Sequence, residues 1–338
     1  AACAAALSDG NPEVQLGAAL ALGGIGGGEM KAALPKLQQA LGHADPLVRA
    51  RAAAALGRAG TEAASAVNLL MERLNDPNWE VRSAAAEALG RIGPAAKEAA
   101  LPIAEALIGD RIWYAAAEAL GRLGEGAHAA LPKLIEALKN PKLDPNIAAN
   151  ICIAIGRMKP APAAGVAPLI EMFLSNSRIV QDCAVRGVVS LGAMAVNDLK
   201  AALAHKDGRM RQCAAEALGG IGPASKDAVP ELIRLIRVES NHVGDWNVPA
   251  IGALGRIGPG AKEAIPALFV MLEKDPGVWA VTGARQPAAQ ALGQLGKASA
   301  PQLARLRELL KKERDHSVAQ KMERAIQMIE AAEGGQAP

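Results

Sequence analysis

The tripeptide Ala-Leu-Gly, or a close variant of it, recurs through the chain and limits what this sequence can fold into. Successive recurrences are 34, 33, 31, 35, 36, 27, 36 and 38 residues apart. A period of this length holds two helices and two turns, too little for an independent domain, so neighbouring repeats must stack to bury a common core. A tenth helix near 325–326 lacks the glycine. In the other repeats the tripeptide ends at Gly23, Gly57, Gly90, Gly121, Gly156, Gly192, Gly219, Gly255 and Gly293.

The clearest repeat covers residues 76–107 and reads DPNWEVRSAAAEALGRIGPAAKEAALPIAEAL. Asp76-Pro77 predicts a helix cap followed by a proline in the first helical turn. The helix after it, which we call the second helix of the repeat, carries apolar residues at helical spacing and is ended by Gly93-Pro94. The helix that ends before the next Asp-Pro is the first helix.

The composition fits close helix packing. Aromatic residues make up 2% of the chain, so the core must be built from Ala, Leu, Ile and Val. The net charge is +3, which residues 297–330 alone supply with 8 Lys/Arg against 5 Asp/Glu. The rest of the chain is balanced and does not favour a nucleic-acid partner.

The repeats resemble bacterial HEAT-like repeats of the type also found in phycobilin lyases. The resemblance is carried by DPLVRARAAAALGRAG, DPNWEVRSAAAEALGRIG and GRMRQCAAEALGGIG, and extends more loosely over nearly the whole chain. It implies an all-α fold, a right-handed α-solenoid of about ten helical hairpins whose second helices line the concave side. We therefore expect a single solenoid over 1–332, with an incomplete N-terminal repeat, a charged capping repeat at 297–332 and a disordered tail at 333–338.

A helical wheel separates the two faces of each second helix. Counting back from the glycine, positions 9, 5 and 2 form the core side, and positions 7 and 3 lie opposite. The opposite pair is polar or mixed in several repeats: Ser83 and Glu87, Tyr114 and Glu118, Gln212 and Glu216.

Two middle repeats depart from this pattern. The pair before Gly156 is Ala149 and Ile153, and the pair before Gly192 is Val185 and Val189, beside Arg186. On adjacent helices these side chains would form one apolar patch of the kind that marks a partner site. The alternative is internal cover by superhelical curvature or by the loop at 139–146.

Tryptophan and arginine recur at fixed places. Trp79, Trp113, Trp246 and Trp279 stand near the starts of second helices, where they either pack on the turn or serve as binding anchors. Trp246 and Trp279 are the better binding candidates, because their loops are longer than the repeat requires. One arginine follows the glycine and suits the helix dipole. Another stands eight positions before it, and the resemblance implies that it pairs with turn aspartates such as Asp45 and Asp76; a phosphate-binding row is the alternative.

The sequence gives little support for catalysis. The cysteines lie in apolar helical contexts without metal-ligand spacing, and none of the five histidines is followed by glutamate. No nucleophile elbow or phosphate loop is present. We expect no enzyme activity, no cofactor and no metal, and the absence of 18 consecutive apolar residues predicts no membrane span.

The leading interpretation is a non-enzymatic scaffold that binds another protein on the concave face or on repeat-edge loops. The alternative, which the resemblance implies, is a lyase-like or chaperone-like protein that handles a bilin or haem. The sequence leaves the location open: the cysteine usage favours the cytoplasm, but a removed signal peptide would imply the periplasm or secretion. The chain opens on the uncapped stretch AACAAALSDG, which either docks on something or continues into further sequence. The partner-binding candidates are Tyr114, Ala149, Ile153, Val185, Arg186, Val189, Trp246 and Trp279.

Overall fold

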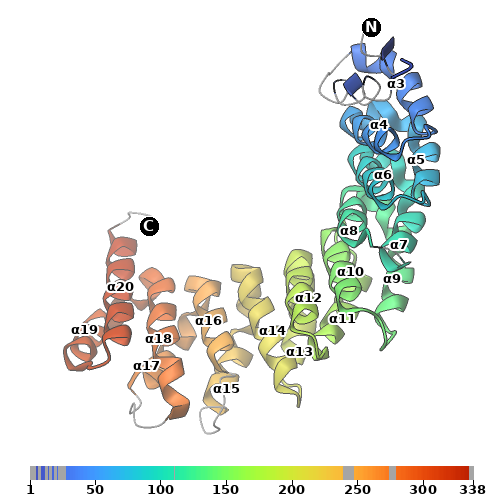
Figure 1. Ribbon diagram of the computed structural model, residues 1–338. Coiled ribbons are helices and arrows are strands. Elements are labelled where there is room, and N and C mark those ends of the chain that lie inside the picture. Colours follow the sequence, from blue (N-terminus) through green and yellow to red (C-terminus); the bar gives the residue numbers. More distant parts are fainter. Residues whose placement is uncertain are drawn as a thin grey trace. The chain divides into compact units, whose positions relative to one another are not determined.

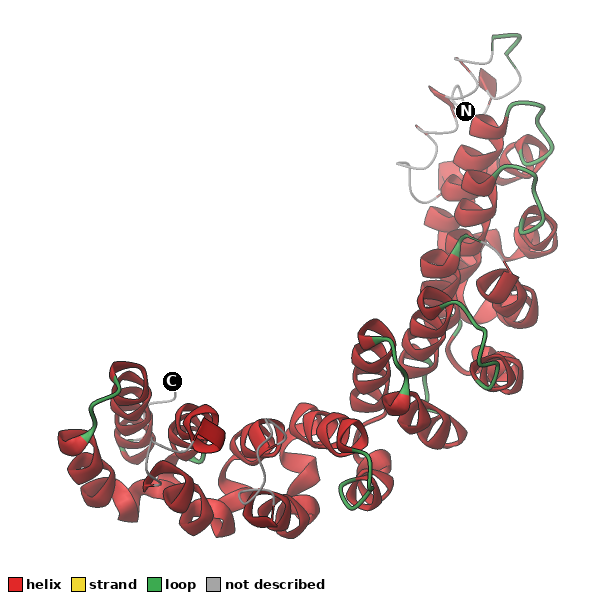
Figure 2. Ribbon diagram, turned by 60° about the horizontal axis from the view of Figure 1, so that its bottom comes forward, coloured by secondary structure: helices red, strands yellow, loops and turns green. Residues whose placement is uncertain are grey.

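The computed structural model of this 338-residue chain describes residues 28–109, 111–238, 247–273 and 279–334, with a few residues before 28. Every regular element in these ranges is a helix (Figure 2). The predicted all-α solenoid class is confirmed. Within the predicted tail at 333–338, Glu333 is the last residue of α20 and Gly334 is its cap, whereas residues 335–338 lie outside the described residues. Most of the N-terminal repeat, with its Gly23, also lies outside them.

The helices form two layers in each half of the chain, as Figure 1 shows. Even-numbered helices are the predicted second helices, and each contacts the next even-numbered one within its half. The second helices are α4 (Pro46–Ala59), α6 (Trp79–Ile92), α8 (Trp113–Arg122), α10 (Pro145–Arg157), α12 (Arg178–Leu191), α14 (Gly208–Ile221), α16 (Asn247–Ile257), α18 (Trp279–Gln294) and α20 (His316–Glu333). The first helices are α3 (Gly28–Ala40), α5 (Val67–Arg73), α7 (Ala100–Gly109), α9 (Leu131–Leu138), α11 (Val166–Glu171), α13 (Val196–Ala202), α15 (Val229–Val238), α17 (Ile265–Glu273) and α19 (Leu303–Lys312).

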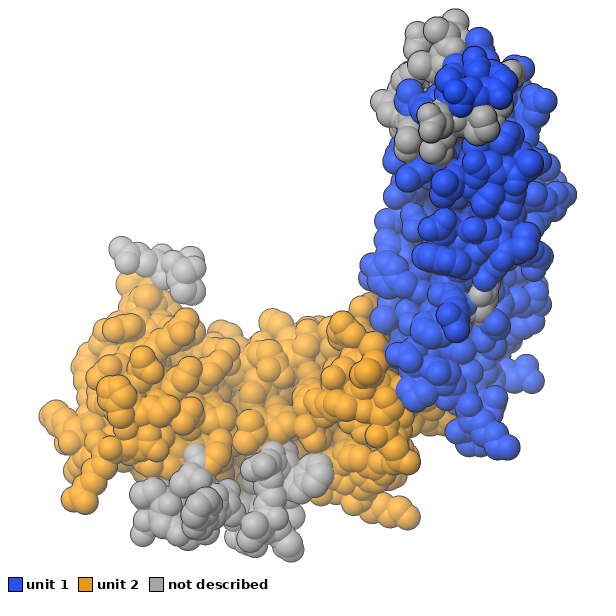
Figure 3. All heavy atoms as spheres, in the orientation of Figure 1, with its two compact units in different colours: residues 1–168 blue, residues 169–338 orange. Residues whose placement is uncertain are grey.

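The chain divides into two compact units, residues 1–168 and 169–338 (Figure 3). In each unit the core consists of small and aliphatic side chains between the two helix layers, as the composition predicts. Phe173 and Phe269 are the largest fully buried side chains of the described residues, and both lie in the second unit. A single solenoid over 1–332 stays a prediction.

Several pairs of successive second helices meet through a glycine–alanine contact. A Cβ on Gly90 would lie 2.6 Å from the Cα of Ala119, closer than real Cβ atoms come to a backbone. The two helices therefore touch at their backbones, and only glycine fits at this point. We call the residue at this place the register residue of its repeat. The same contact joins Gly57 to Ala88, Gly219 to Ala253, Gly255 to Ala291 and Gly293 to Ala325.

Turns between the helices follow local rules. Gly93, three residues after the register residue, has a φ of 72° and starts the turn into the first helix. Asp45 and Asp144 cap α4 and α10, each ahead of a proline. In α6 the cap is Asn78 rather than Asp76, which corrects the sequence prediction.

The register of α12 differs from the sequence prediction. Arg82, eight residues before its register glycine, donates hydrogen bonds to the carbonyl oxygens five and six residues before it, at 3.0 and 2.8 Å. In α12 it is Gln181 that donates to the carbonyl six residues before it, at 2.7 Å. The register residue of this repeat is therefore Val189. Gly192, with a φ of 73°, is the turn glycine three residues later.

Val189 brings a compensating change in the next repeat. Elsewhere a small register residue lies under a large side chain, as Gly219 lies under the guanidinium of Arg256. Here a Cβ on Gly220, the residue equivalent to Arg256, would lie 2.6 Å from Cγ2 of Val189. Large and small residues have exchanged places, which keeps the contact filled without overpacking.

One stretch of the described residues, 178–202, is long enough to span a membrane and contains an 18-residue window with a mean hydropathy of 1.4. Half of that window is buried inside the structure. It consists of α12 and α13, broken by the turn at Gly192, and its apolar residues include core residues of that hairpin.

Candidate functional site

The exposed stripe comprises the residues three and seven positions before each register residue. In α6 these are Glu87, which is exposed, and Ser83, which is half-buried. In α8 they are Glu118, half-buried, and Tyr114, which is 66% exposed. The predicted outward direction of this stripe is confirmed in both helices.

The repeat of α10 does not follow the stripe pattern. Ala149 is only 3% exposed and belongs to the core, which corrects the prediction that it faces outward. Ile153 is half-buried and Arg157 is exposed. Only part of the predicted apolar surface is therefore accessible in this repeat.

The corrected register changes the stripe of α12. Its members are Asp182 and Arg186, not Val185 and Val189. Arg186 is exposed, whereas both valines are half-buried, and Val189 packs on the next repeat. The interpretation of this helix as an apolar exception was wrong, because the Leu-Gly pair at its end is not the register motif.

The two tryptophans favoured from the sequence yield no site. Trp246 lies outside the described residues, and Trp279 is the first residue of α18, with a side chain outside them too. Trp79, in contrast, is 57% exposed at the start of α6. The sequence alone favours Trp79 less than Trp246 and Trp279, although a tryptophan at the first residue of a second helix is expected at the rim. Leu47, near the start of α4, is 45% exposed.

A groove lies between α6 and α8 on the exposed stripe, and we call it the first groove. It has a volume of about 140 Å³. Its cations and anions pair: Arg91 lies 3.8 Å from Glu87, and Arg122 lies 2.6 Å from Glu118. Arg157 of α10 also reaches Glu118, at 3.5 Å. The charged side chains of this groove therefore largely neutralise one another, leaving the exposed ring of Tyr114 at its edge.

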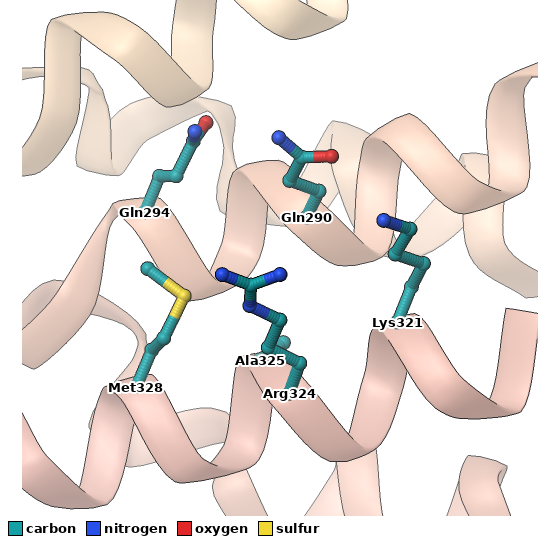
Figure 4. A pocket seen from close by; sticks show the side chains of 6 residues that line it. All are labelled: Gln290, Gln294, Lys321, Arg324, Ala325 and Met328. Atoms are coloured by element: carbon teal, nitrogen blue, oxygen red, sulfur yellow. The ribbon is translucent and has the colours of Figure 1, made fainter.

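An equivalent groove, the C-terminal groove, lies between α18 and α20 and has a volume of about 150 Å³ (Figure 4). Its lining residues occupy the same repeat positions as those of the first groove. The charges differ, because no carboxylate lines it. The lining consists of Gln290, Gln294, Lys321, Arg324, Ala325 and Met328.

The arginine eight positions before the register residue is a structural group in the N-terminal repeats. Arg49 makes two 2.8 Å hydrogen bonds to the carboxylate of Asp76, and both residues are buried. Burial alone would raise the pKa of Asp76, but hydrogen bonds from Arg49 and the Asn78 amide, with the charges of Arg49 and Arg73, hold that pKa below its ordinary value. The implied pairing with Asp76 is confirmed. Asp45 instead caps α4.

Several cysteine and histidine side chains are buried or are held by hydrogen bonds in turns. Cys152, Cys183 and Cys213 are buried, and burial raises the pKa of the Cys213 thiol to about 12. His43 and His205 each accept a backbone hydrogen bond within the turn before a second helix, at 3.0 Å. Within the described ranges no three His, Cys, Asp or Glu side chains come together as a metal site. Cys3 lies outside those ranges.

Comparisons with known proteins show which family models and solved structures the chain resembles. A family model of HEAT repeats matches residues 1–67, 34–113 and 67–149. No curated protein matches the chain. Among solved structures, a complex of Kap95p with RanGDP has a TM-score of 0.61 at 14% identity, covering 99% of this chain and 52% of that one. Importin beta gives 0.60 at 16%, covering 98% and 52%, and Kap121p bound to Nup53p gives 0.60 at 14%, covering 97% and 41%. The chain thus spans about half of these proteins or less.

Proposed function

We propose that this chain, a HEAT-like repeat protein, is a non-enzymatic scaffold that binds another protein on the exposed stripe of its second helices. The observation that carries the proposal is the first groove with Tyr114 at its edge. Tyr114 is 66% exposed and lies beside a polar groove whose charges are paired. Protein interfaces commonly combine an aromatic anchor with a polar rim in this way. Trp79, 57% exposed in the adjacent repeat, supplies a second aromatic anchor in the same unit.

Two further observations support a protein partner. The grooves of α6–α8 and α18–α20 occupy the same repeat positions, one in each unit, so the second-helix layer of each unit offers a comparable surface to a ligand. The similar solved structures include Kap121p bound to Nup53p and Kap95p bound to RanGDP, which are complexes of a helical repeat protein with another protein. The fold alone does not specify a function, and the exposed aromatic residues give the proposal its location.

The proposal is tested by placing a photo-crosslinking amino acid at position 114. The matched control places it at Leu101, which is 46% exposed but lies on α7, in the other helix layer. We expect a discrete crosslinked protein from position 114 and none from position 101. The captured protein is then purified, and its affinity is measured for Tyr114→Ala and Leu101→Ala variants.

Tyr114→Ala should weaken binding about tenfold, because truncating an aromatic anchor costs more than 1 kcal/mol. Leu101→Ala should leave the affinity unchanged. Equal crosslinking from both positions, or equal affinity of both variants, would contradict the proposed surface.

A further inference from the structure

The C-terminal groove differs from the first groove in its charges: among the described residues, no carboxylate pairs with its cations. In the first groove each arginine lies beside a stripe glutamate. In the C-terminal groove the stripe positions hold Gln290 and Arg324 instead. Across the described ranges, neither Lys321 nor Arg324 makes an ion pair. Two cations three residues apart on one helix face repel each other, so an anion bound between them would be stabilised.

The walls of this groove are fixed by close helix packing. Ala325 is 1% exposed, and a Cβ on Gly293 would lie 2.8 Å from its Cα. The sulfur of Met328 lies over the same glycine and closes one end with apolar surface. The charged and amide groups are therefore presented from two helices that cannot slide apart without losing the core contact.

The C-terminal groove is continuous with a second depression. A second depression of about 350 Å³ lies along α20 and shares Lys321 and Arg324 with the C-terminal groove. Its remaining lining is Gln320, Glu323 and Gln327. An extended ligand can thus pass over both cations and meet amide side chains on either side.

We propose that the C-terminal groove binds an acidic peptide segment, with a carboxylate between Lys321 and Arg324. The occupant is taken as a protein segment because the proposed function calls for a protein partner. The amides of Gln290 and Gln294 carry both donors and acceptors, which match the N–H and C=O groups of a peptide backbone. A nucleic acid fits less well, because no aromatic side chain lines either depression for base stacking.

The test is fluorescence polarisation with a labelled ten-residue peptide of alternating Glu and Gly, using the full chain. The double variant Lys321→Gln with Arg324→Gln should bind at least about tenfold more weakly, since two charge-assisted contacts are lost. The matched control is Arg91→Gln with Arg122→Gln, which removes the same charge from the first groove. Because those arginines are already paired, the control should bind like the parent protein.

Three results would overturn the inference: no binding of the acidic peptide, equal loss in both double variants, or stronger binding of a ten-nucleotide single strand than of the peptide. Circular dichroism melts of both variants should match the parent, since all four side chains are at least partly exposed. This assay is independent of position 114. If no partner is captured at position 114 but the acidic peptide still binds, only the proposed function is refuted. If a partner is captured at position 114 but the acidic peptide does not bind, only the acidic ligand is refuted.

Discussion

The requirement for glycine at the register position of a repeat such as that of α6 can be tested by adding a side chain there. Alanine normally stabilises a helix interior relative to glycine by about 1 kcal/mol. At Gly90 the added Cβ would meet the Cα of Ala119 at 2.6 Å, so the neighbouring helix would have to retreat by about 0.8 Å to restore an ordinary 3.4 Å contact. Overpacking of this kind costs about 1–3 kcal/mol, and a backbone atom gives way less easily than a side-chain end.

Gly90→Ala should therefore lower the free energy of unfolding by about 1–2 kcal/mol despite its better helix propensity. The control is Gly252→Ala in the middle of α16, where the nearest atom, a terminal nitrogen of Arg256, lies at 3.6 Å. That substitution should raise stability by about 0.5–1 kcal/mol. Urea titration followed by helical circular dichroism measures both midpoints, and hydrogen exchange of α6 and α8 locates the loss. If Gly90→Ala raises the midpoint as Gly252→Ala does, the contact between helix backbones is not a determinant of this fold.

Two further predictions concern contacts between repeats. Asp76→Asn should destabilise the protein by about 3 kcal/mol at neutral pH, because it leaves the buried guanidinium of Arg49 without its counter-ion. The pKa of Asp76 in the folded protein is below its ordinary value of 3.8, so the stability that Asp76 supplies is present above pH 3.8 and is lost as the pH falls through the folded pKa. The urea midpoints of the parent protein and the variant should therefore converge in acid. A difference between the midpoints that stays constant with pH would contradict the assignment. Gly220→Arg should destabilise the protein because the new side chain meets Val189. Adding Val189→Gly should recover the lost stability, with a coupling energy of about 1–2 kcal/mol measured by denaturant titration. Additive effects of the two substitutions would refute the exchange of large and small residues.

The sequence was sufficient for the repeat architecture because the period and the apolar spacing are local properties. The core side of each second helix, the polar stripe in α6 and α8, and the caps at Asp45 and Asp144 all follow from residues within one repeat. The pairing of Arg49 with Asp76 was implied by the family resemblance and is confirmed.

The candidate site was less accessible to sequence reasoning. Placing the register at Gly192 gave spacings of 36 and 27, and those uneven values were the signal that the motif had been misplaced. Placing it at Val189 gives 33 and 30. The favoured tryptophans were chosen for unusual loops, whereas exposure of Trp79 depends on where the helix start lies against its neighbours.

By itself, the sequence determined that this chain forms stacked helical hairpins with small residues at their contacts. Only the tertiary structure decided which side chains remain available to a partner. Val189 packs into the space left by Gly220 of the next repeat. Arg91 is neutralised by Glu87, whereas Arg324 has no carboxylate partner among the described residues. These outcomes depend on the alignment of one helix against the next, which the period of a single repeat does not specify.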